Sequence, residues 1–463
     1  MQTVVGPVPA GWELTTLGEA CKRTGGDVQT GPFGSQLHAA DYVPEGIPSI
    51  MPQNIGENRV VEDGIARITL ADAERLSRYR VNVGDIVYSR RGDVERRALI
   101  RAEEEGWLCG TGCLRVRFGD WSVSPVYASY YLGHPSVREW IVRHAHGATM
   151  ANLNTSILSS LPFVIPPEVE QHAIAHVLGA LDDKIELNRR LNQTLEEIAR
   201  ALFRSWFVDF DPVRAKAAGR QPEGMDAETA ALFPSLYVDS DSGVPLVPVE
   251  WKETTLAEAA EINPVRPLRK GEMAPYLDMA NVPTVGSRAK QWVDRPFGSG
   301  TRFRNGDVLL ARITPCLENG KTAFVDFLDD GQVGWGSTEF IVLRSRSPLP
   351  AVWAYCLARD PNFREFAIRS MSGTSGRQRV PAEAVGRYRV VVPSPEVAER
   401  FAQIVDPLFA AIKQRDEESR TLASIRDALL PRLLSGELRV REVDDLSVAG
   451  SSGEHLVASV IGR

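Results

Sequence analysis

The chain contains two versions of one sequence unit, and this duplication restricts its possible folds more than any other feature. The segment PAGWELTTLGEA at 9–20 returns as PVEWKETTLAEA at 248–259, an offset of 239 residues. The segment LPFVIPPEVEQ at 161–171 returns as YRVVVPSPEVA at 388–398, an offset of 227. Internal repetition on this scale predicts two copies of one structural unit, each of roughly 200 residues. The total length of 463 residues agrees, because one hydrophobic core rarely organises so long a chain.

Each copy has a first part with short β-prone runs and a second part with a helical pattern. Runs such as GDIVYS, LRVRF, DVLLARI and FIVLRS, separated by Gly and Pro, predict a globule of mixed α/β structure. After each globule, apolar residues recur at spacings of three and four, which is the pattern of one helix face. The positions expected to pack one long helix on the other are Ile174, Leu178, Leu181, Ile185, Leu195, Leu202, Phe401, Val405, Leu408, Ile412, Leu422 and Leu429.

Polar residues interrupt both helical stripes at the same level. Asn188 and Asn192 stand in the gap of the first stripe, and Arg415 and Ser419 stand 227 residues later in the second. A shared polar layer is typical of two helices packed on each other, where it fixes their alignment at some cost in stability. A helix from 168 to 208 reaches about 60 Å. We therefore expect a helical spacer between two globules, in preference to two independent domains.

The pattern divides the chain into six segments. Between the copies, a stretch rich in Pro, Gly, Ala and acidic residues reads as a surface connection. The expected bounds are a first globule at 1–166, a central spacer helix at 167–210, a connecting segment at 211–247, a second globule at 248–393, a C-terminal spacer helix at 394–440 and a poorly ordered tail at 441–463.

Composition indicates a soluble protein of the cytoplasm. Hydrophobic residues make up 43% and charged residues 24% of the chain, the range of globular proteins. No apolar run approaches the ~18 residues of a membrane helix, and the N-terminus lacks the pattern of a signal peptide. The five cysteines are scattered, which fits a reducing compartment. The net charge of −7 argues against a wholly basic nucleic-acid binder but leaves local basic patches open.

The sequence lacks the motifs of common catalytic and cofactor sites. The stretch LENGKTAFV resembles the end of a P-loop, but Pro315 stands where the motif needs its first glycine, so ATP binding is not expected. Motifs for dinucleotide binding, metalloproteases and α/β-hydrolases are missing. Cys109 and Cys113 have no second ligand pair, and no metal site is expected.

Recognition chemistry recurs at matching places of the two copies. The Gly-Asp pairs at 84–85 and 306–307 are followed by the polar segments YSRRGDVERR and ARITPCLENGK. The segments GATMANLNTS at 147–156 and GTSGRQRVPAE at 373–383 end the two globules. Arg reads phosphate and guanine, and Asn and Gln read adenine. We expect Asp85 and Asp307 to cap turns, because DNA would repel them. Trp12 and Trp251 are expected to anchor the two cores.

These residues resemble the specificity subunit of type I restriction–modification enzymes. The resemblance covers about 9–440 and rests on TGPFGSQL, IPSIMPQNI, GDIVYSRRG, NLNTSILSSLPFVIPPEVEQ and DPVRAKAAGRQPEGM, and in the second half on GDVLLARITPCLENGKTAF and GSTEFIVLRS. It implies an α/β (α+β) fold with two target-recognition globules, separated by two antiparallel helices that form a coiled-coil spacer with a pseudo-two-fold internal repeat.

The resemblance also implies partners and a division of labour. Each globule would read one half of a split, asymmetric target in double-stranded DNA. Two methyltransferase subunits would bind S-adenosylmethionine and flip an adenine in each half-site. Two restriction/translocase subunits would use ATP and Mg to move along and cleave DNA. This chain would hold no cofactor, contact no membrane and catalyse nothing alone.

The candidate DNA-contacting residues lie in the loops named above. They are Ser35, Gln53, Asn54, Arg90, Arg91, Arg96, Asn152 and Asn154 in the first globule, and Arg312, Thr314, Asn319, Lys321, Arg377, Gln378 and Arg379 in the second. Two other classes of function stay open. One is a coiled-coil adaptor with two peptide-binding modules, which would lack the steep salt dependence of DNA binding. The other is a self-sufficient methylating or nucleolytic enzyme, against which the missing motifs speak.

Overall fold

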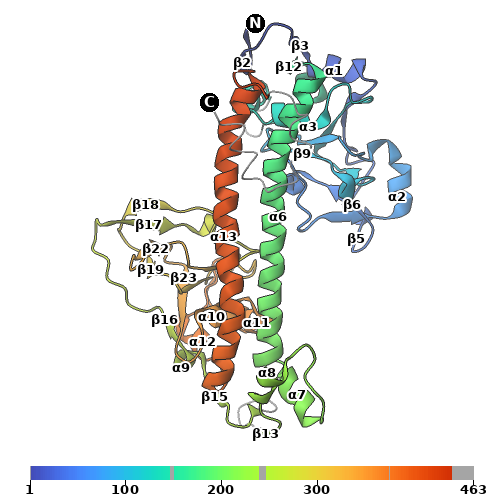
Figure 1. Cartoon of the computed structure of the whole chain (residues 1–463). Coiled ribbons are helices and arrows are strands. Elements are labelled where there is room, and N and C mark those ends of the chain that lie inside the picture. The colour runs from blue at the N-terminus through green and yellow to red at the C-terminus, as the bar shows by residue number, and fades with distance from the viewer. Residues whose placement is uncertain (1, 146–150, 239–246, 375, 441–463) are drawn as a thin grey trace. The chain divides into compact units, whose positions relative to one another are not determined.

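The computed structural model describes residues 2–145, 151–238, 247–374 and 376–440, so the tail expected at 441–463 lies outside the described residues. The chain forms two compact units. Unit 1 contains residues 1–185 and 420–463, and unit 2 contains residues 186–419. The boundary falls inside both long helices, α6 (Glu168–Phe207) and α13 (Pro395–Leu434). Each unit therefore consists of one globule and part of each long helix (Figure 1).

Unit 1 is built on two four-stranded sheets, ordered β4-β11-β8-β9 and β10-β6-β7-β5, and on a two-stranded ribbon, β12-β3. Its strands are β1 (Gln2–Thr3), β2 (Gly6–Pro7), β3 (Glu13–Thr16), β4 (Asp27–Thr30), β5 (Tyr42–Val43), β6 (Ile47–Ile50), β7 (Ala66–Ile68), β8 (Ile86–Ser89), β9 (Arg97–Leu99), β10 (Leu108–Cys109), β11 (Cys113–Arg117) and β12 (Pro162–Ile165). Its short helices are α1 (Leu17–Arg23), α2 (Leu70–Arg75), α3 (Pro125–Tyr131), α4 (Pro135–His144) and α5 (Thr155–Ser159).

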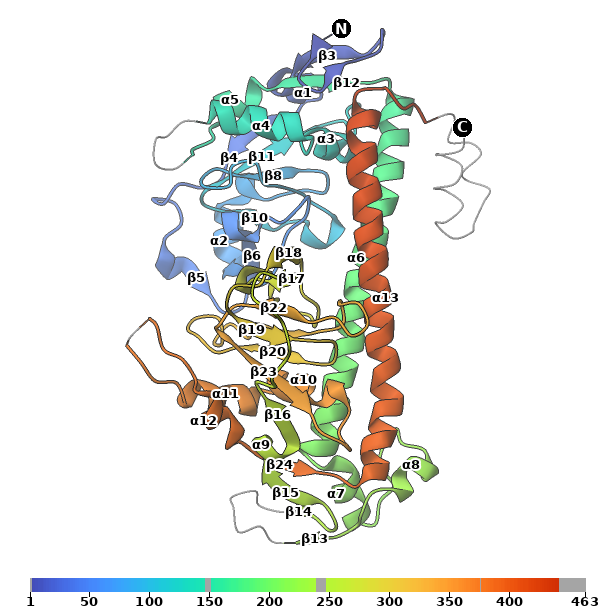
Figure 2. The ribbon, with the colours of Figure 1, turned by 90° about the vertical axis from the view of Figure 1, so that its left-hand side faces the viewer.

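Unit 2 repeats this plan with sheets β16-β23-β20-β21 and β18-β17-β22-β19 and the ribbon β15-β24 (Figure 2). Its strands are β13 (Tyr237–Val238), β14 (Val247–Pro248), β15 (Lys252–Thr255), β16 (Ala260–Ile262), β17 (Met273–Leu277), β18 (Val293–Pro296), β19 (Thr301–Phe303), β20 (Val308–Ala311), β21 (Thr322–Phe324), β22 (Gly334–Gly336), β23 (Phe340–Ser345) and β24 (Arg389–Val392). Its short helices are α7 (Asp211–Ala217), α8 (Ala227–Ala231), α9 (Leu256–Ala259), α10 (Ala351–Arg359), α11 (Pro361–Arg369) and α12 (Ala382–Gly386).

The two topologies confirm the internal repeat. The antiparallel sheet of unit 1 has the same strand order as its counterpart in unit 2, and the pairs β10–β6 and β22–β17 are both parallel. Trp12 and Trp251 are buried at 5% and 7% exposure, which confirms their expected places in the two cores. The mixed α/β class predicted from the short runs is therefore correct for both units.

Inside unit 2, α6 and α13 run antiparallel and meet at the predicted polar layer. The side-chain amide of Asn188, which is fully buried, donates to Oε2 of Glu418 at 2.8 Å and to Oγ of Ser419 at 3.3 Å. The amide of Asn192 donates to the carbonyl oxygen of Ile412 at 3.3 Å. Because later residues of α6 meet earlier residues of α13, the helices are antiparallel there, and the polar residues do align them.

The same two helices also pair inside unit 1. Nη1 of Arg426 lies 2.7 Å from Oδ1 of Asp182, and both side chains are largely buried. Ile174 and Leu178 share a hydrophobic cluster with Leu433. Each unit thus holds its helix pair by its own apolar and polar contacts.

Most of the predicted helix-packing positions lie in or against the hydrophobic cores. Ile174, Leu178, Leu181, Phe401, Val405 and Ile412 are buried; Leu195, Leu202, Leu408 and Leu429 are partly buried against the cores; Ile185 and Leu422 are half-buried. The buried face of α6 leaves out Ile198, which is 48% exposed. Here the buried face has shifted to Ala199, Phe203 and Trp206, which pack on the globule and the connecting segment of unit 2.

The connecting segment differs from the surface connection expected at 211–247. It forms α7, α8 and β13, and Val213 and Phe233 are buried in the main cluster of unit 2. The Phe233 ring meets the Trp206 ring edge-on at 4.9 Å. The segment is therefore part of the unit 2 core along its described residues. None of the described helices combines the length and apolarity that a membrane crossing requires.

Candidate nucleic-acid interface

In unit 1, the chain leaving β8 crosses the segment that precedes α5, and Arg90 stands at the crossing. The Arg90 amide donates to the carbonyl oxygen of Gly112 at 2.8 Å, and the Leu153 amide donates to the carbonyl oxygen of Arg90 at 2.9 Å. Arg91 and Asn152 form an isolated β-bridge beside it. Backbone hydrogen bonds on both sides therefore fix the position from which the Arg90 side chain projects.

Unit 2 builds the same crossing around Arg312. The Arg312 amide donates to the carbonyl oxygen of Glu339 at 3.0 Å, and the Val380 amide donates to the carbonyl oxygen of Arg312 at 2.9 Å. Ile313 and Arg379 form the corresponding β-bridge. Arg312 follows Arg90 at the offset of 222 that relates β8 to β20, and Val380 follows Leu153 at the offset of 227. The two globules, although diverged in sequence, thus hold an arginine by the same pattern of backbone hydrogen bonds.

Both arginines have a donor that the described part of the chain leaves unused. The Nε atoms of Arg90 and Arg312 are buried and have no hydrogen-bond partner among the described residues. A buried donor without an acceptor costs free energy, and both arginines remain partly exposed to a ligand from outside. The Arg90 guanidinium also lies 6.0 Å from the ring of Phe33, within the range of a cation–π contact.

Several other predicted residues are exposed near these crossings or in the loops that follow them. Ser35, Gln53 and Arg91 of unit 1 and Asn319 and Arg377 of unit 2 are exposed. Asn152 and Gln378 are half-buried beside the crossings. These seven keep side chains that the described structure does not use for a side-chain hydrogen bond.

The remaining predicted residues have partners inside the protein. Asn54 is fully buried and its amide binds the carbonyl oxygens of Val61 and Asp63 at 3.1 and 3.4 Å. Oδ1 of Asn154 caps α5 by accepting from the Ile157 amide at 2.8 Å. For these two, the structure favours a role in holding loops, not in touching DNA.

The other four predicted residues of this group also form hydrogen bonds or ion pairs inside the protein. Arg96 pairs with Asp93 at 3.0 Å, and Nζ of Lys321 donates to the carbonyl oxygen of Met279 at 2.6 Å. Arg379 forms a fork with both carboxylate oxygens of Glu339 at 2.7–3.0 Å, which raises its pKa. Oγ1 of Thr314 donates to the carbonyl oxygen of Gln378 at 3.3 Å. These contacts hold the crossing loops in shape.

The two Gly-Asp aspartates lie inside the protein, as expected. Asp85 accepts from the Asn82 amide at 2.8 Å and pairs with Arg117 at 2.6 Å. Asp307 accepts from the Arg304 amide at 2.9 Å, and its buried carboxylate is held by Arg266 and Arg344. Both carboxylates close the turn before the central strand, and neither is available to a ligand.

Sequence reasoning missed an exposed apolar side chain that follows the same edge strand in each unit. Phe33 follows β4 and is 52% exposed, and Val265 follows β16 and is 88% exposed. β4 and β16 are the corresponding edge strands of the two antiparallel sheets. An exposed ring beside an arginine is suited to stacking on bases. The signal was present, because Phe33 is the one large apolar residue of the Gly-rich stretch TGPFGSQ.

Comparison with known proteins gives consistent results, from a family model over part of the chain and from relatives over most of it. The family model described as "Type I restriction modification DNA specificity domain" matches residues 9–197. The chain is 26% identical over 452 residues to the type I restriction enzyme HindI specificity subunit of Haemophilus influenzae, covering 84% of this chain and 95% of that protein. It is 24% identical over 459 residues to the MjaIX specificity subunit of Methanocaldococcus jannaschii, covering 96% and 97%.

The fold agrees with these matches. A crystal structure of the type I restriction–modification S subunit from M. genitalium aligns with a TM-score of 0.51 at 17% identity and covers 91% of this chain and 96% of that chain. The resemblance first drawn from motifs such as NLNTSILSSLPFVIPPEVEQ therefore holds for the sequence and for the fold. The chain is thus similar over most of its length to specificity subunits of type I restriction enzymes, and residues 9–197 match the domain model of that family.

Proposed function

We propose that this chain selects the DNA target of a type I restriction–modification complex, with each unit reading one part of a split, asymmetric sequence. The observation that carries this proposal is the matched pair of crossings around Arg90 and Arg312. Each crossing holds its arginine by equivalent backbone hydrogen bonds. In each, the buried Nε of the arginine has no partner among the described residues. An arginine fork held in one place suits the O6 and N7 acceptors of guanine or a backbone phosphate.

The neighbours of the two arginines differ, and so should the bases read. Arg90 is followed by Arg91 and lies near the Phe33 ring, whereas Arg312 is followed by Ile313 and Thr314. Base selection depends on which donors and acceptors reach the groove. Two unlike sets predict two unlike half-sites.

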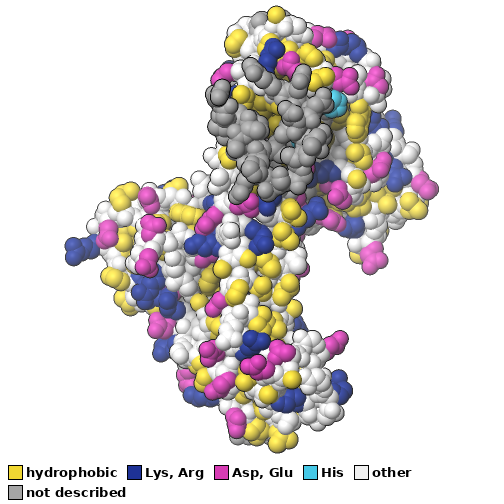
Figure 3. Space-filling model, viewed as in Figure 1, with side chains coloured by type: hydrophobic (Ala, Val, Ile, Leu, Met, Phe, Trp, Pro, Cys, Tyr) yellow, Lys and Arg dark blue, Asp and Glu magenta, His cyan; other side chains and the backbone are white. Residues whose placement is uncertain are grey.

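Catalysis belongs to partner subunits in this proposal. Two methyltransferase subunits supply S-adenosylmethionine and modify an adenine in each half-site, and two restriction/translocase subunits supply ATP- and Mg-dependent cleavage. Support for docking comes from an exposed apolar stripe on the unit 2 part of α6, formed by Leu187, Leu191 and Ile198 with exposures of 51%, 38% and 48%. Figure 3 shows apolar side chains along this part of the helix. An exposed apolar row is typical of a surface that a partner covers.

The decisive experiment is a genome-wide map of adenine methylation in source cells with this gene intact and deleted. We expect one split, asymmetric methylated motif to disappear on deletion while all other motifs stay. Restoring the gene on a plasmid should restore the motif. An unchanged map in cells that express the gene and its methyltransferase partner would contradict the proposal.

A binding assay separates this function from a protein-binding adaptor. Affinity of the assembled complex for a DNA duplex should fall steeply as salt rises, because arginine contacts to phosphate release counterions. Incubating the purified chain alone with DNA and S-adenosylmethionine should leave the DNA unmodified. Methylation by the chain alone would indicate a self-sufficient enzyme instead.

A further inference from the structure

A polar pocket of about 210 Å³ lies in unit 1, and Arg90 is not among the residues that line it. Its wall combines Arg97 at the start of β9, Arg138 of α4, and residues of both long helices, including Asp182 and Arg426. All of its lining residues belong to unit 1. The pocket therefore sits where the globule of unit 1 meets its helix pair.

Arg97 is a buried cation without a counter-ion among the described residues. It is 6% exposed, and its Nε donates to the carbonyl oxygen of Ser129 at 2.6 Å. Its terminal nitrogens have no hydrogen bond or ion pair with any described residue, and the nearest opposing charge, Glu57, acts on it only at longer range. Gly133 leaves them room, because a Cβ at that position would lie 1.8 Å from Nη2. Burial lowers the pKa of Arg97, yet arginine keeps its proton in proteins, so the unpaired charge is costly.

In the corresponding place of unit 2, a guanidinium has a hydrogen-bond acceptor for every one of its donors. Arg359 ends α10 directly before the Asp360–Pro361 start of α11, as Gly133 precedes His134–Pro135 at the start of α4. Its guanidinium donates to Oη of Tyr355 at 3.0 Å and to the carbonyl oxygens of Thr284 at 2.6 Å, Gly320 at 2.9 Å, Thr322 at 3.1 Å and Gly286. Every N–H of that arginine has an acceptor inside the protein.

The space that forms the pocket in unit 1 is filled by aromatic side chains in unit 2. The Phe409 ring of α13 packs on Phe324 and Tyr355, with ring centroids 5.5 Å apart in each pair. The position of α6 that corresponds to Phe409 is Asp182, at the repeat offset of 227, and Ser129 corresponds to Tyr355. Unit 1 thus replaces two aromatic rings by a carboxylate and a hydroxyl, which leaves a cavity lined by polar groups.

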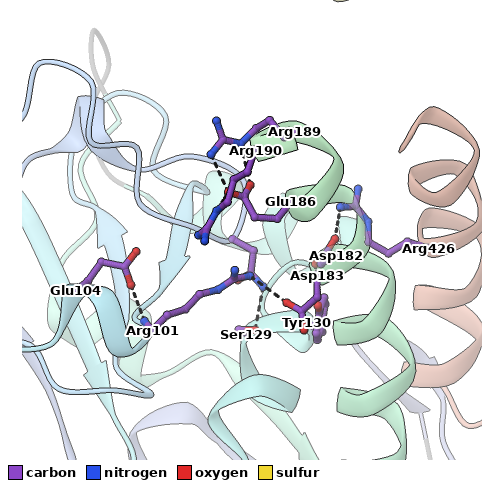
Figure 4. A network of polar contacts seen from close by, with 11 residues as sticks. Arg101, Glu104, Ser129, Tyr130, Asp182, Asp183, Glu186, Arg189, Arg190 and Arg426 are labelled. Atoms are coloured by element: carbon purple, nitrogen blue, oxygen red, sulfur yellow. Dashed lines mark hydrogen bonds and ion pairs between the residues drawn. The ribbon is translucent and has the colours of Figure 1, made fainter. Parts of the chain in front are cut away.

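The carboxylates of the pocket do not neutralise Arg97. Figure 4 shows Asp182 held between Arg426 and Tyr130, with distances of 2.7 Å to each. Arg426 also binds Asp427 at 2.7 Å. Glu57 is exposed at the rim and forms no ion pair with Arg97. Arg138, whose side chain is 41% exposed and lies 3.8 Å from a carboxylate oxygen of Glu95, adds a second guanidinium at the opening.

We propose that this unit 1 pocket binds a small oxyanion from solution, with the terminal nitrogens of Arg97 as its main donors and Arg138 at its mouth. A guanidinium presents parallel N–H groups that match the oxygens of a phosphate or a carboxylate. The bound anion would supply acceptors to the terminal nitrogens of Arg97, as four carbonyl oxygens do for Arg359 in unit 2. Because the pocket wall includes the globule and both long helices, binding stabilises their packing within unit 1.

The test is thermal unfolding of the full chain in rising phosphate, acetate or chloride at constant ionic strength, with calorimetric titration of the same anions. We expect a saturable rise in Tm of about 2–4 °C with an oxyanion and none with chloride. Phosphate alone raising the Tm indicates a tetrahedral anion, and acetate acting equally well indicates a carboxylate. The absence of a saturable effect of both oxyanions would overturn the proposal.

Four variants locate the site. Arg97→Met should abolish the effect, and Arg138→Ala, which leaves the core untouched, should raise the anion Kd about 5- to 10-fold. Arg143→Ala, at the exposed end of the same helix α4, and Arg312→Ala, at the proposed DNA site, should leave the Kd unchanged. If Arg97→Met does not fold, the Arg138→Ala result decides. An effect that persists in Arg138→Ala and in a folded Arg97→Met is nonspecific and refutes the site.

Discussion

At the scale of single residues, Asp326 of unit 2 shows how burial and imperfect pairing combine. Its side chain is 15% exposed and its Oδ1 lies 3.1 Å from Nε of Arg288, but the two atoms are not aligned for a hydrogen bond. Arg288 also faces Asp416 and Glu417 of α13. Burial therefore outweighs the attraction of Arg288 and raises the pKa of Asp326 from its ordinary value of 3.8 to about 6.

This shift predicts a stability that falls as pH rises. Protonated Asp326 favours the folded state, so its contribution is complete below pH 4 and lost as pH rises through 6. Asp326→Asn stays neutral at every pH. We expect its free energy of unfolding to rise relative to that of the wild type as pH goes from 4 to 7, by about 3 kcal/mol at most. The measurement is the Tm of both proteins across this range. The exposed Asp330→Asn provides the control, and a difference independent of pH would contradict the assignment.

Residue identity also sets the limit of what the sequence could predict about the DNA site. Asn54 and Asn154 are candidates from the sequence because Asn reads adenine, but Asn is equally a residue of turns and helix caps, which is how the fold uses both. Arg90 and Arg312 were within reach of sequence reasoning, because the repeat offset relates them. Their unpaired Nε atoms were not, because pairing depends on the crossing segments around Leu153 and Val380.

At the scale of elements, the helix pair was predictable where both copies share one register. Asn188 meets Arg415 and Ser419, which are the repeat counterparts of Asn188 and Asn192, so the polar gap in the sequence located the contact. The buried face of α6 does not keep one strict repeat along the helix, because a straight helix drifts relative to such a repeat. Past Asn192 the face of α6 that is buried belongs to Phe203 and Trp206, not to Ile198.

The same element leaves a row of apolar side chains that a partner should cover. Leu187, Leu191 and Ile198 follow at four and seven residues and so share one face of α6. We expect Leu191→Asp to weaken assembly with the methyltransferase subunit about 10-fold or more, because a charge would have to be buried in the interface. Analytical ultracentrifugation of the mixed subunits measures this.

The matched control is Gln193→Asp, an exposed position on another face of the same helix. Both variants should keep the wild-type Tm, because neither site is buried in the unit 2 core. Equal loss of assembly in the two variants would assign the effect to added charge and not to the apolar row. Full assembly of Leu191→Asp would remove this face as the docking surface.

At the scale of the whole molecule, the duplication separates two recognition sites energetically. The cores of the two units share no residue: the main cluster of unit 1 is built around Leu17, Tyr127 and Leu178, and that of unit 2 around Phe203, Trp353 and Phe401. Arg90 and Arg312 have different backbone partners throughout. Sites without shared partners contribute to binding independently.

A double-mutant cycle tests this independence directly. Arg90→Ala and Arg312→Ala should each cost about 1–3 kcal/mol of DNA-binding free energy in the assembled complex, and the double variant should lose the sum within about 0.5 kcal/mol. Each single variant should relax the sequence requirement in one half-site and leave the other half unchanged. The readout is the Kd for the mapped target and for duplexes with one half-site scrambled, at one fixed salt concentration. Scrambling the half-site of a mutated unit should cost little further affinity, whereas scrambling the other should cost as much as in the wild type. A loss that falls on both half-sites for Arg312→Ala would mean that this arginine supports the fold of its unit instead of reading a base.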